Sequence, residues 1–106
     1  MMFPKNKPKR SLAVRNSAKG EKCALMFDCC NGDPETTIYA HLRFFNHGGV
    51  SSKPHDILGV YACSSCHDAL DGRTRVNWEW DAVLRALMST LVSLSHKGIV
   101  KMRGEK

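Results

Sequence analysis

Five cysteines in a chain of 106 residues are the feature that most constrains what this sequence can fold into. A domain of this size buries a small hydrophobic core, and such domains commonly need disulfides or a structural metal to hold their fold. After Phe3 the chain continues into Pro4 and Lys5 instead of an apolar signal segment, and no apolar stretch has the length of a membrane span. We therefore expect a cytoplasmic protein with no membrane partner, in which reduced thiols bind metal.

Cys63 and Cys66 have the Cys-x-x-Cys spacing of one half of a structural zinc site. Four thiolates complete such a site, so two more ligands must come from Cys23, Cys29 and Cys30. Adjacent residues on an extended chain point to opposite sides, which argues against Cys29 and Cys30 binding one ion together. Because a turn follows Cys30 and lets the backbone curl around an ion, we expect Cys23 and Cys30 to be the ligands, at a wider spacing than the usual two to four residues.

Two other interpretations of these cysteines compete with zinc. A thioredoxin-like redox pair at Cys63 and Cys66 would need the motif to open a helix in a βαβ unit, which a chain this short hardly provides. The remaining alternative is that the cysteines are ordinary buried side chains.

A second set of metal-binding residues follows Cys66 directly. If a helix begins there, His67 and Asp71 lie four residues apart on one helical face. Imidazole and carboxylate ligands suit Mg²⁺, Mn²⁺ or Zn²⁺. His41, at the end of an expected strand, could face the same ion as a general base, although a lone strand histidine is more often structural. Asp68 has an alternative explanation as a first-turn acid that the helix dipole favours.

The net charge of +6 is concentrated at the N-terminus. The first twenty residues carry basic side chains and no acid, whereas the remainder of the chain is formally neutral. We expect residues 1–14 to form a flexible basic arm and residues 15–106 to form a single domain. Such an arm favours a phosphate backbone, because its binding releases condensed counterions, although a tail that only aids solubility is the alternative. The expected nucleic-acid contacts are Lys5, Lys7, Lys9, Arg10, Arg15 and Lys53.

Local patterns predict a small α+β fold. Ser11 is an expected cap for a short helix that stops at Gly20, and strands are expected at residues 36–42 and 57–62 around a loop at 44–56. We expect a short helix after Cys66 and a long amphipathic helix from Trp80 to Gly98, capped by Asn77. Its apolar stripe is expected to form core or to pair with a second copy of the chain; it comprises Val83, Leu84, Leu87, Met88, Leu91 and Val92.

The order of several motifs resembles the prophage YbcO-like nuclease family over about residues 15–100. These motifs are Cys-(x6)-Cys-Asn-Gly-x-Pro-Glu-Thr, then Ala40-His41-Leu42-Arg43, Lys53-Pro54-x-Asp56, and Ala62-Cys63-x-x-Cys66-His67-Asp68-x-x-Asp71. More broadly the chain looks like the HNH, or ββα-metal, endonuclease superfamily, to which Ref-type phage recombination nucleases belong. The resemblance implies a zinc-stapled ββα-metal fold with a β-hairpin and a short metal-site helix.

The resemblance also implies roles for individual residues. His41 matches the general base, and His67 matches a ligand of a catalytic Mg²⁺ or Mn²⁺. Asp56 falls near the place of a middle asparagine, where it could accept from His41 and fix its tautomer. Many relatives carry a second metal ligand where this chain has Ala40, which leaves Asp71 as the candidate second ligand. Arg43 would hold a phosphate oxygen.

The function that the resemblance implies is metal-dependent hydrolysis of DNA in phage or prophage recombination or processing, in the cytoplasm of a bacterial host. The zinc site would hold the fold and take no part in the chemistry. The alternative is a non-catalytic zinc module that binds nucleic acid. The sequence does not distinguish duplex, single-stranded or branched DNA from one another or from RNA, and a homodimer is an open possibility.

Overall fold

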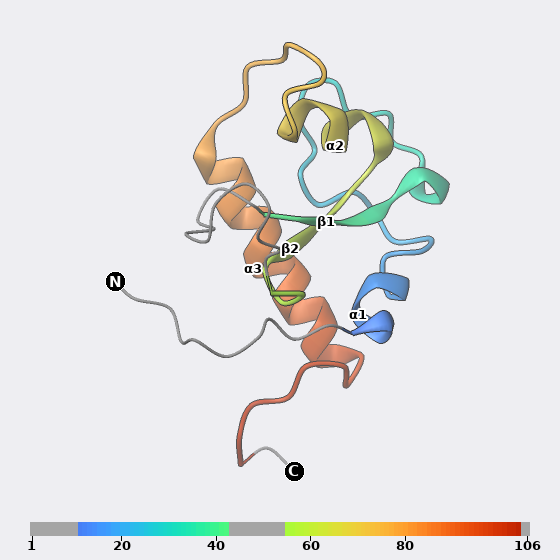
Figure 1. Ribbon diagram of the computed structural model, residues 1–106, viewed down its shortest axis with the longest axis vertical. Helices are drawn as coiled ribbons and strands as arrows, with labels where there is room; N and C mark the ends of the chain where they lie inside the picture. The colour runs from blue at the N-terminus through green and yellow to red at the C-terminus, as the bar shows by residue number, and fades with distance from the viewer. Residues whose placement is uncertain (1–10, 43–54, 105–106) are drawn as a thin grey trace.

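The computed structural model describes residues 11–42 and 55–104 as a small α+β fold (Figure 1). Within these residues, three α-helices and one short 3-10 turn surround a two-stranded antiparallel sheet. None of the described helices is long and apolar enough to cross a membrane. The elements in chain order are α1 (Leu12–Asn16), η1 (Pro34–Thr36), β1 (Ile38–His41), β2 (Gly59–Ala62), α2 (Ser64–Leu70) and α3 (Trp80–His96).

Several expectations fall on residues that are not described, namely 1–10, 43–54 and 105–106. They concern most of the expected basic arm, most of the loop between the strands, and the proposed phosphate contact. These expectations stay predictions, and the residues concerned are Lys5, Lys7, Lys9, Arg10, Arg43 and Lys53.

The helix caps differ in part from the sequence prediction. Ser11 caps α1 as expected, since its hydroxyl accepts from the backbone N–H of Val14 at 3.2 Å, but α1 ends at Asn16 instead of running on toward Gly20. α2 begins at Ser64, because the Cys63 sulfur accepts from the Cys66 backbone N–H and caps the helix. α3 is capped by Glu79 without a side-chain hydrogen bond, so the expected Asn77 cap is wrong.

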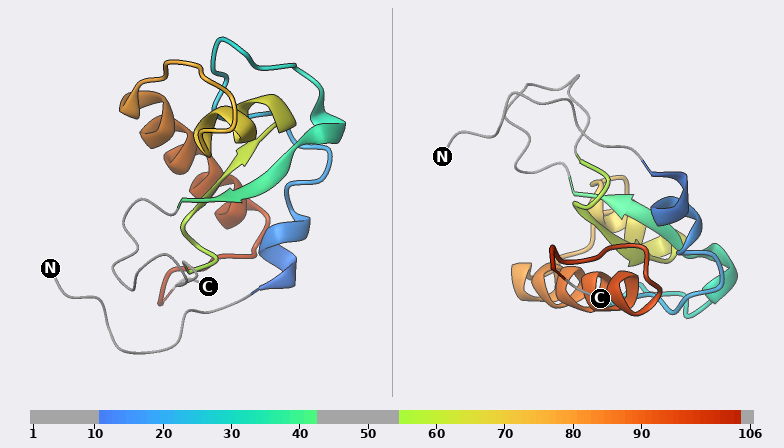
Figure 2. Two further views of the ribbon diagram at one scale, coloured as in Figure 1. Left: turned by 45° about the horizontal axis from the view of Figure 1, so that its top comes forward. Right: turned by 90° about the horizontal axis from the view of Figure 1, so that it is seen from below.

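The β-hairpin separates two hydrophobic clusters because successive strand residues point to opposite faces. In one cluster, residues 40, 42, 60 and 62 pack with α2 and with the N-terminal half of α3. In the other, Tyr39 and Tyr61 pack with Val14 of α1 and with Leu94 near the end of α3. Val14 is therefore part of the folded structure, although it falls within the expected arm. Figure 2 shows α3 as an outer layer along one side of the sheet, with α1 on the other side.

The buried face of α3 is not the one that the sequence pattern predicts. Val83 is buried as expected, but the deepest positions are Ala86, Thr90 and Leu94. The small side chains of Ala86 and Thr90 let the helix axis approach β2 closely, and the Thr90 hydroxyl accepts from the backbone N–H of Tyr61 at 3.1 Å. The prediction of core positions is wrong for three residues that are more than half exposed, Leu84, Met88 and Val92.

Position 59 requires glycine, because Tyr39 of the neighbouring strand leaves no room for a side chain there. A Cβ added at Gly59 would lie 2.4 Å from Tyr39 Cε2 and 3.0 Å from the carbonyl oxygen of Ala40. Tyr39 is buried and makes a T-shaped contact with the His41 ring, so it has little room to move.

We expect Gly59→Ala to lower the free energy of unfolding by about 1–3 kcal/mol, the usual cost of forcing extra volume into a packed core. Urea titration followed by circular dichroism would measure this loss. In a Tyr39→Leu background, which removes the obstructing ring, the same substitution should cost less. An equal cost in both backgrounds would contradict this explanation.

Candidate metal centre and active site

Four cysteines converge from three segments of the chain. The sulfur atoms of Cys23, Cys30, Cys63 and Cys66 all lie within 4.8 Å of one another, and those of Cys30 and Cys63 are 3.8 Å apart. Four thiolates around a zinc ion at about 2.3 Å stand roughly 3.8 Å from each other. The Cys30 and Cys63 sulfurs have this spacing, and no other pair exceeds it by more than about 1 Å. All five cysteines are free thiols. The structure thus places the four predicted ligands where they could hold one metal ion.

Backbone geometry explains the unusual spacing between Cys23 and Cys30. The Cys23 sulfur accepts from the backbone N–H of Met26 at 3.5 Å, just as the Cys63 sulfur accepts from that of Cys66 at 3.4 Å. Met26 takes a left-handed φ of 48°, which closes the turn. Residues 23–26 therefore curl as a Cys-x-x-Cys segment does, and the second ligand comes from Cys30 because position 26 lacks a thiol.

The acidity of these thiols fits a site built for a cation. Burial alone would raise the pKa of the Cys63 thiol, but N–H groups of Cys66 and Asn31 directed at the sulfur outweigh it and lower the pKa to about 7. Burial raises the pKa of the Cys66 and Cys30 thiols, and the nearby Cys23 thiolate raises it further. Four thiolates this close repel one another, so their joint ionisation requires a bound cation.

Cys29 stands outside this group. Its partly buried sulfur donates to the backbone carbonyl of Ser65 at 3.6 Å. The structure therefore selects Cys30 over Cys29, as predicted. The segment is not extended, however: residues 27–30 form a turn in which the Cys30 N–H donates to the Phe27 carbonyl at 2.8 Å.

His41 and Asp56 form a second group at the opposite end of the hairpin from the cysteines. His41 Nε2 lies 2.8 Å from Asp56 Oδ1, and Asp56 is buried with 3% of its surface exposed. A carboxylate at this position favours the tautomer in which Nε2 carries the proton and Nδ1 is an acceptor. The structure thus brings together the predicted base and its predicted orienting acid.

The sequence did not reveal that α1 also holds Asp56. The backbone N–H of Ser11 donates to Asp56 Oδ2, and the Arg15 guanidinium lies 3.8 Å from the same oxygen. These two donors, together with His41, compensate a carboxylate that burial would otherwise disfavour. The sequence indicates Ser11 as the cap that fixes where α1 begins. It could not show that the Ser11 backbone N–H binds Asp56, because the two residues are 45 positions apart.

His67 of α2 meets Asp71, the residue that caps the end of this helix, as their spacing predicts. His67 Nε2 lies 3.0 Å from Asp71 Oδ2, and both side chains are partly exposed. The Arg73 guanidinium lies 3.6 Å from the Asp71 carboxylate and 3.3 Å from the Asp68 carboxylate, so it bridges the two acids. Within residues 11–42 and 55–104, only the four cysteines form a group of three or more potential ligands that are close enough to share one ion. His41 therefore does not lie close enough to His67 and Asp71 to share an ion with them.

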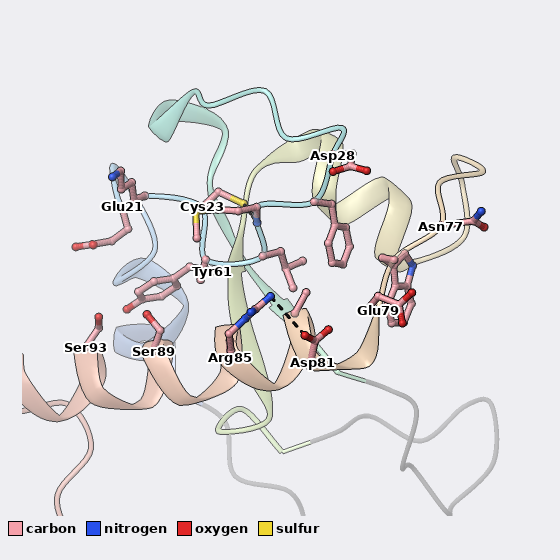
Figure 3. Close-up of a pocket in the computed structure, with 17 residues that line it drawn as sticks. Glu21, Cys23, Asp28, Tyr61, Asn77, Glu79, Asp81, Arg85, Ser89 and Ser93 are labelled. Atoms are coloured by element: carbon pink, nitrogen blue, oxygen red, sulfur yellow. Dashed lines mark hydrogen bonds and ion pairs between the residues drawn. The ribbon is translucent and has the colours of Figure 1, made fainter.

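A groove of about 870 Å³ lies between residues 21–28 and α3 (Figure 3). Neither His41 nor His67 lines it. Its charged lining holds four acids, Glu21, Asp28, Glu79 and Asp81, against Lys22 and Arg85. Arg85 pairs with Asp81 at 3.8 Å. A groove with excess negative charge repels phosphates, so it does not suit a nucleic-acid backbone.

The geometry defines a class of small α+β domain with four cysteines placed to hold a metal ion and a histidine oriented by a buried carboxylate. The chain belongs to the YbcO family: the family model described as "Putative nuclease YbcO" matches residues 12–98. The predicted family membership is thereby confirmed, whereas the wider HNH superfamily remains a prediction.

Individual relatives agree with this membership. The chain is 34% identical over 92 residues to "Putative nuclease YbcO" of Escherichia coli (strain K12) and to "Putative nuclease ybcO" of Enterobacteria phage 82, covering 83% of this chain and 96% of each relative. A solved structure of "a putative bacteriophage protein from Escherichia coli str. K-12 substr. MG1655" superposes with a TM-score of 0.65 at 33% identity, covering 81% of this chain and all of that one.

The metal centre predicts about one zinc ion per chain in protein purified under reducing conditions. Cys30→Ser should lose zinc and unfold at lower temperature, because the binding free energy of the ion contributes to folding. Cys29→Ser is the matched control and should keep both zinc and stability. Elemental analysis and thermal unfolding would measure these outcomes; zinc retention in Cys30→Ser with loss in Cys29→Ser would reverse the assignment.

Proposed function

We propose that this protein is a metal-dependent endonuclease of the HNH type that hydrolyses phosphodiester bonds in DNA. The observation that carries the proposal is the contact between His41 and the buried Asp56, because it prepares a histidine to accept a proton. The relatives named as nucleases support the same reaction class. Phage and prophage relatives also favour a role in phage DNA recombination or processing, in the cytoplasm of a bacterial host.

In the proposed mechanism, His41 Nδ1 takes a proton from the water that attacks the scissile phosphate. Asp56 holds the ring through Nε2 and stabilises the imidazolium that forms. The side chain of His41 keeps 18% of its surface exposed, so the ring is open to water, while the Asp56 side chain beneath it has 4% exposed. The exposed His41 can therefore exchange a proton with water, whereas the buried Asp56 serves to orient the ring.

The proposed catalytic ion, Mg²⁺ or Mn²⁺, would be held by His67 and Asp71. Both offer ligating atoms 3.0 Å apart on a surface that solvent reaches, and a nitrogen and carboxylate pair leaves room for water and phosphate oxygens. When bound, such an ion supplies stabilisation of the negative charge on the phosphate and on the leaving oxygen. Asp71 also interacts with Arg73, so metal binding would compete with an existing ion pair.

Basic residues are proposed to hold the DNA backbone. Arg15 is the described member of this group; its side chain is 48% exposed and lies beside Asp56, which places a cation next to the proposed base. The proposal extends to residues outside the described part of the chain, with Arg43 on a phosphate oxygen and the others on the backbone, namely Lys5, Lys7, Lys9, Arg10 and Lys53. Contacts of this kind carry no sequence preference, so the proposed cleavage does not depend on base sequence.

The decisive test is cleavage of supercoiled plasmid with Mg²⁺ or Mn²⁺. We expect His41→Ala to cut at least about 100-fold more slowly than wild type, the lower range for losing a general base. Added imidazole should restore part of the rate if the defect is chemical and not structural. Asn77→Ala, at an exposed loop position, is the control and should cut at the wild-type rate.

A different result would favour the alternative function. If wild type and His41→Ala show equal background cleavage while both bind DNA, the chain is a non-catalytic zinc module that binds nucleic acid. Equal zinc content in the two proteins would exclude a folding defect as the reason.

The proposed metal ligands predict a specific metal dependence. Asp71→Asn should raise the Mn²⁺ concentration needed for half-maximal cleavage at least about tenfold, because an amide is a poorer ligand than a carboxylate. Excess Mn²⁺ should recover most of the rate. Asp68→Asn is a matched control, since Asp68 shares Arg73 but does not contact His67 in the structure. If Asp68→Asn shifts the requirement instead, Asp68 is the ligand.

A further inference from the structure

Arg15 approaches the dyad of His41 and Asp56 without hydrogen-bonding to it. Arg15 Nε lies 3.8 Å from Asp56 Oδ2, which is too long for a hydrogen bond, whereas strong pairs of arginine and carboxylate are bidentate with hydrogen bonds of about 2.8 Å. The Arg15 side chain is 48% exposed. Its guanidinium therefore lends its charge to Asp56 but remains accessible to an acceptor that arrives from solution.

Asp56 does not depend on Arg15 for its position. The backbone N–H of Ser11 donates to Asp56 Oδ2, and His41 Nε2 lies 2.8 Å from Oδ1. If the guanidinium turned to another anion, these two contacts would still hold the carboxylate. Because the Asp56 side chain is 4% exposed, water screens its charge little, and a positive charge on His41 becomes more favourable once Arg15 turns away.

The proposed catalytic ion is not placed to bind beside His41. Within the described residues, only the four cysteines lie close enough together to share an ion, so His41 cannot share the ion proposed at His67 and Asp71. A phosphate beside His41 therefore needs a positive charge from the protein. Arg15 contacts the same carboxylate as His41, and its planar guanidinium carries donors that match two phosphate oxygens.

We propose that Arg15 binds the phosphate that is cut, and that its charge, moved from Asp56 to this phosphate, makes His41 a stronger base. The proposal deepens the proposed nuclease function and rests on it. Before substrate binds, Arg15 offsets the charge of Asp56, which disfavours a second positive charge on His41. Once Arg15 pairs with the phosphate, Asp56 can instead stabilise the imidazolium that forms when His41 takes the proton of the attacking water.

This role differs from that of an ordinary contact to the DNA backbone. A contact to a phosphate away from the cut is equally strong in the ground state and in the transition state, so its loss raises KM and leaves kcat unchanged. A contact to the scissile phosphate strengthens as charge develops there, so its loss lowers kcat. The two roles of Arg15 are therefore separable by steady-state kinetics.

Cleavage of supercoiled plasmid with Mn²⁺ tests the proposal on the full chain. Arg15→Gln should lower kcat at least about 100-fold and change KM by less than about threefold. Arg15→Lys keeps the charge but loses the planar donors, so it should recover only part of the rate. Lys19→Gln is the matched control, because it removes an exposed positive charge from the same segment, and it should keep the wild-type kcat. Zinc content and thermal unfolding would show that each variant is folded.

Nuclear magnetic resonance supplies a second measurement that needs no turnover. The proton on His41 Nε2 reports the hydrogen bond to Asp56, and a stronger bond moves its resonance downfield. A short duplex oligonucleotide, added without Mg²⁺ or Mn²⁺, should move this resonance downfield in wild type. In Arg15→Gln the same addition should leave the resonance nearly unchanged, because no charge is drawn away from Asp56.

Two results would overturn the proposal. One is a kcat of Arg15→Gln equal to that of Lys19→Gln, and the other is the same change of the His41 resonance in Arg15→Gln and in wild type. In both cases His41→Ala would still be inactive, so the nuclease function would stand. Failure of wild type to cleave the plasmid would instead refute the nuclease function, and the proposal with it.

Discussion

The convergence of four cysteine sulfurs is the constraint on which the rest of this structure depends. The sulfurs come from residues 23–30 and from the junction between β2 and α2. Without a cation, the raised pKa of Cys66 and of Cys30 keeps these thiols protonated, so they add no electrostatic attraction between the two segments. A bound cation would attract all four thiolates at once. The strand, the helix and the preceding loop then share one fixed point, which compensates for the small core of a chain of this size.

Cys63 is the residue through which this constraint reaches both proposed sites. Its sulfur is one of the four that could hold an ion and also caps α2, so a bound ion would fix the start of the helix that carries His67 and ends beside Asp71. One residue earlier the chain is β2, whose far end pairs Gly59 with His41. An ion held by the four cysteines would therefore set the relative position of the two proposed catalytic groups without contacting either of them.

The sequence predicted those features that depend on local spacing. The Cys-x-x-Cys segment, the Ser11 cap and the contact between His67 and Asp71 all involve residues at most four apart, and the structure contains each of them. The choice of Cys30 over Cys29 also followed from local geometry. Asp56 was placed beside His41 through family resemblance, because no local pattern relates residues 15 apart across a loop.

Sequence periodicity failed where tertiary packing decides. On α3 it marked the large apolar residues as core, yet the sheet packs against Ala86 and Thr90, whose small size a hydrophobicity pattern discounts. The contact between Asp56 and the N-terminal end of α1 could not be predicted either, because its donor is a backbone N–H, which every residue except proline has. The dyad of His41 and Asp56 thus draws on three separate segments, with contacts that span 15 and 45 residues. Contacts of such long range form late in folding, so under the proposed function a nascent or partly folded chain would have no nuclease activity, and cleavage would begin only once the fold is complete.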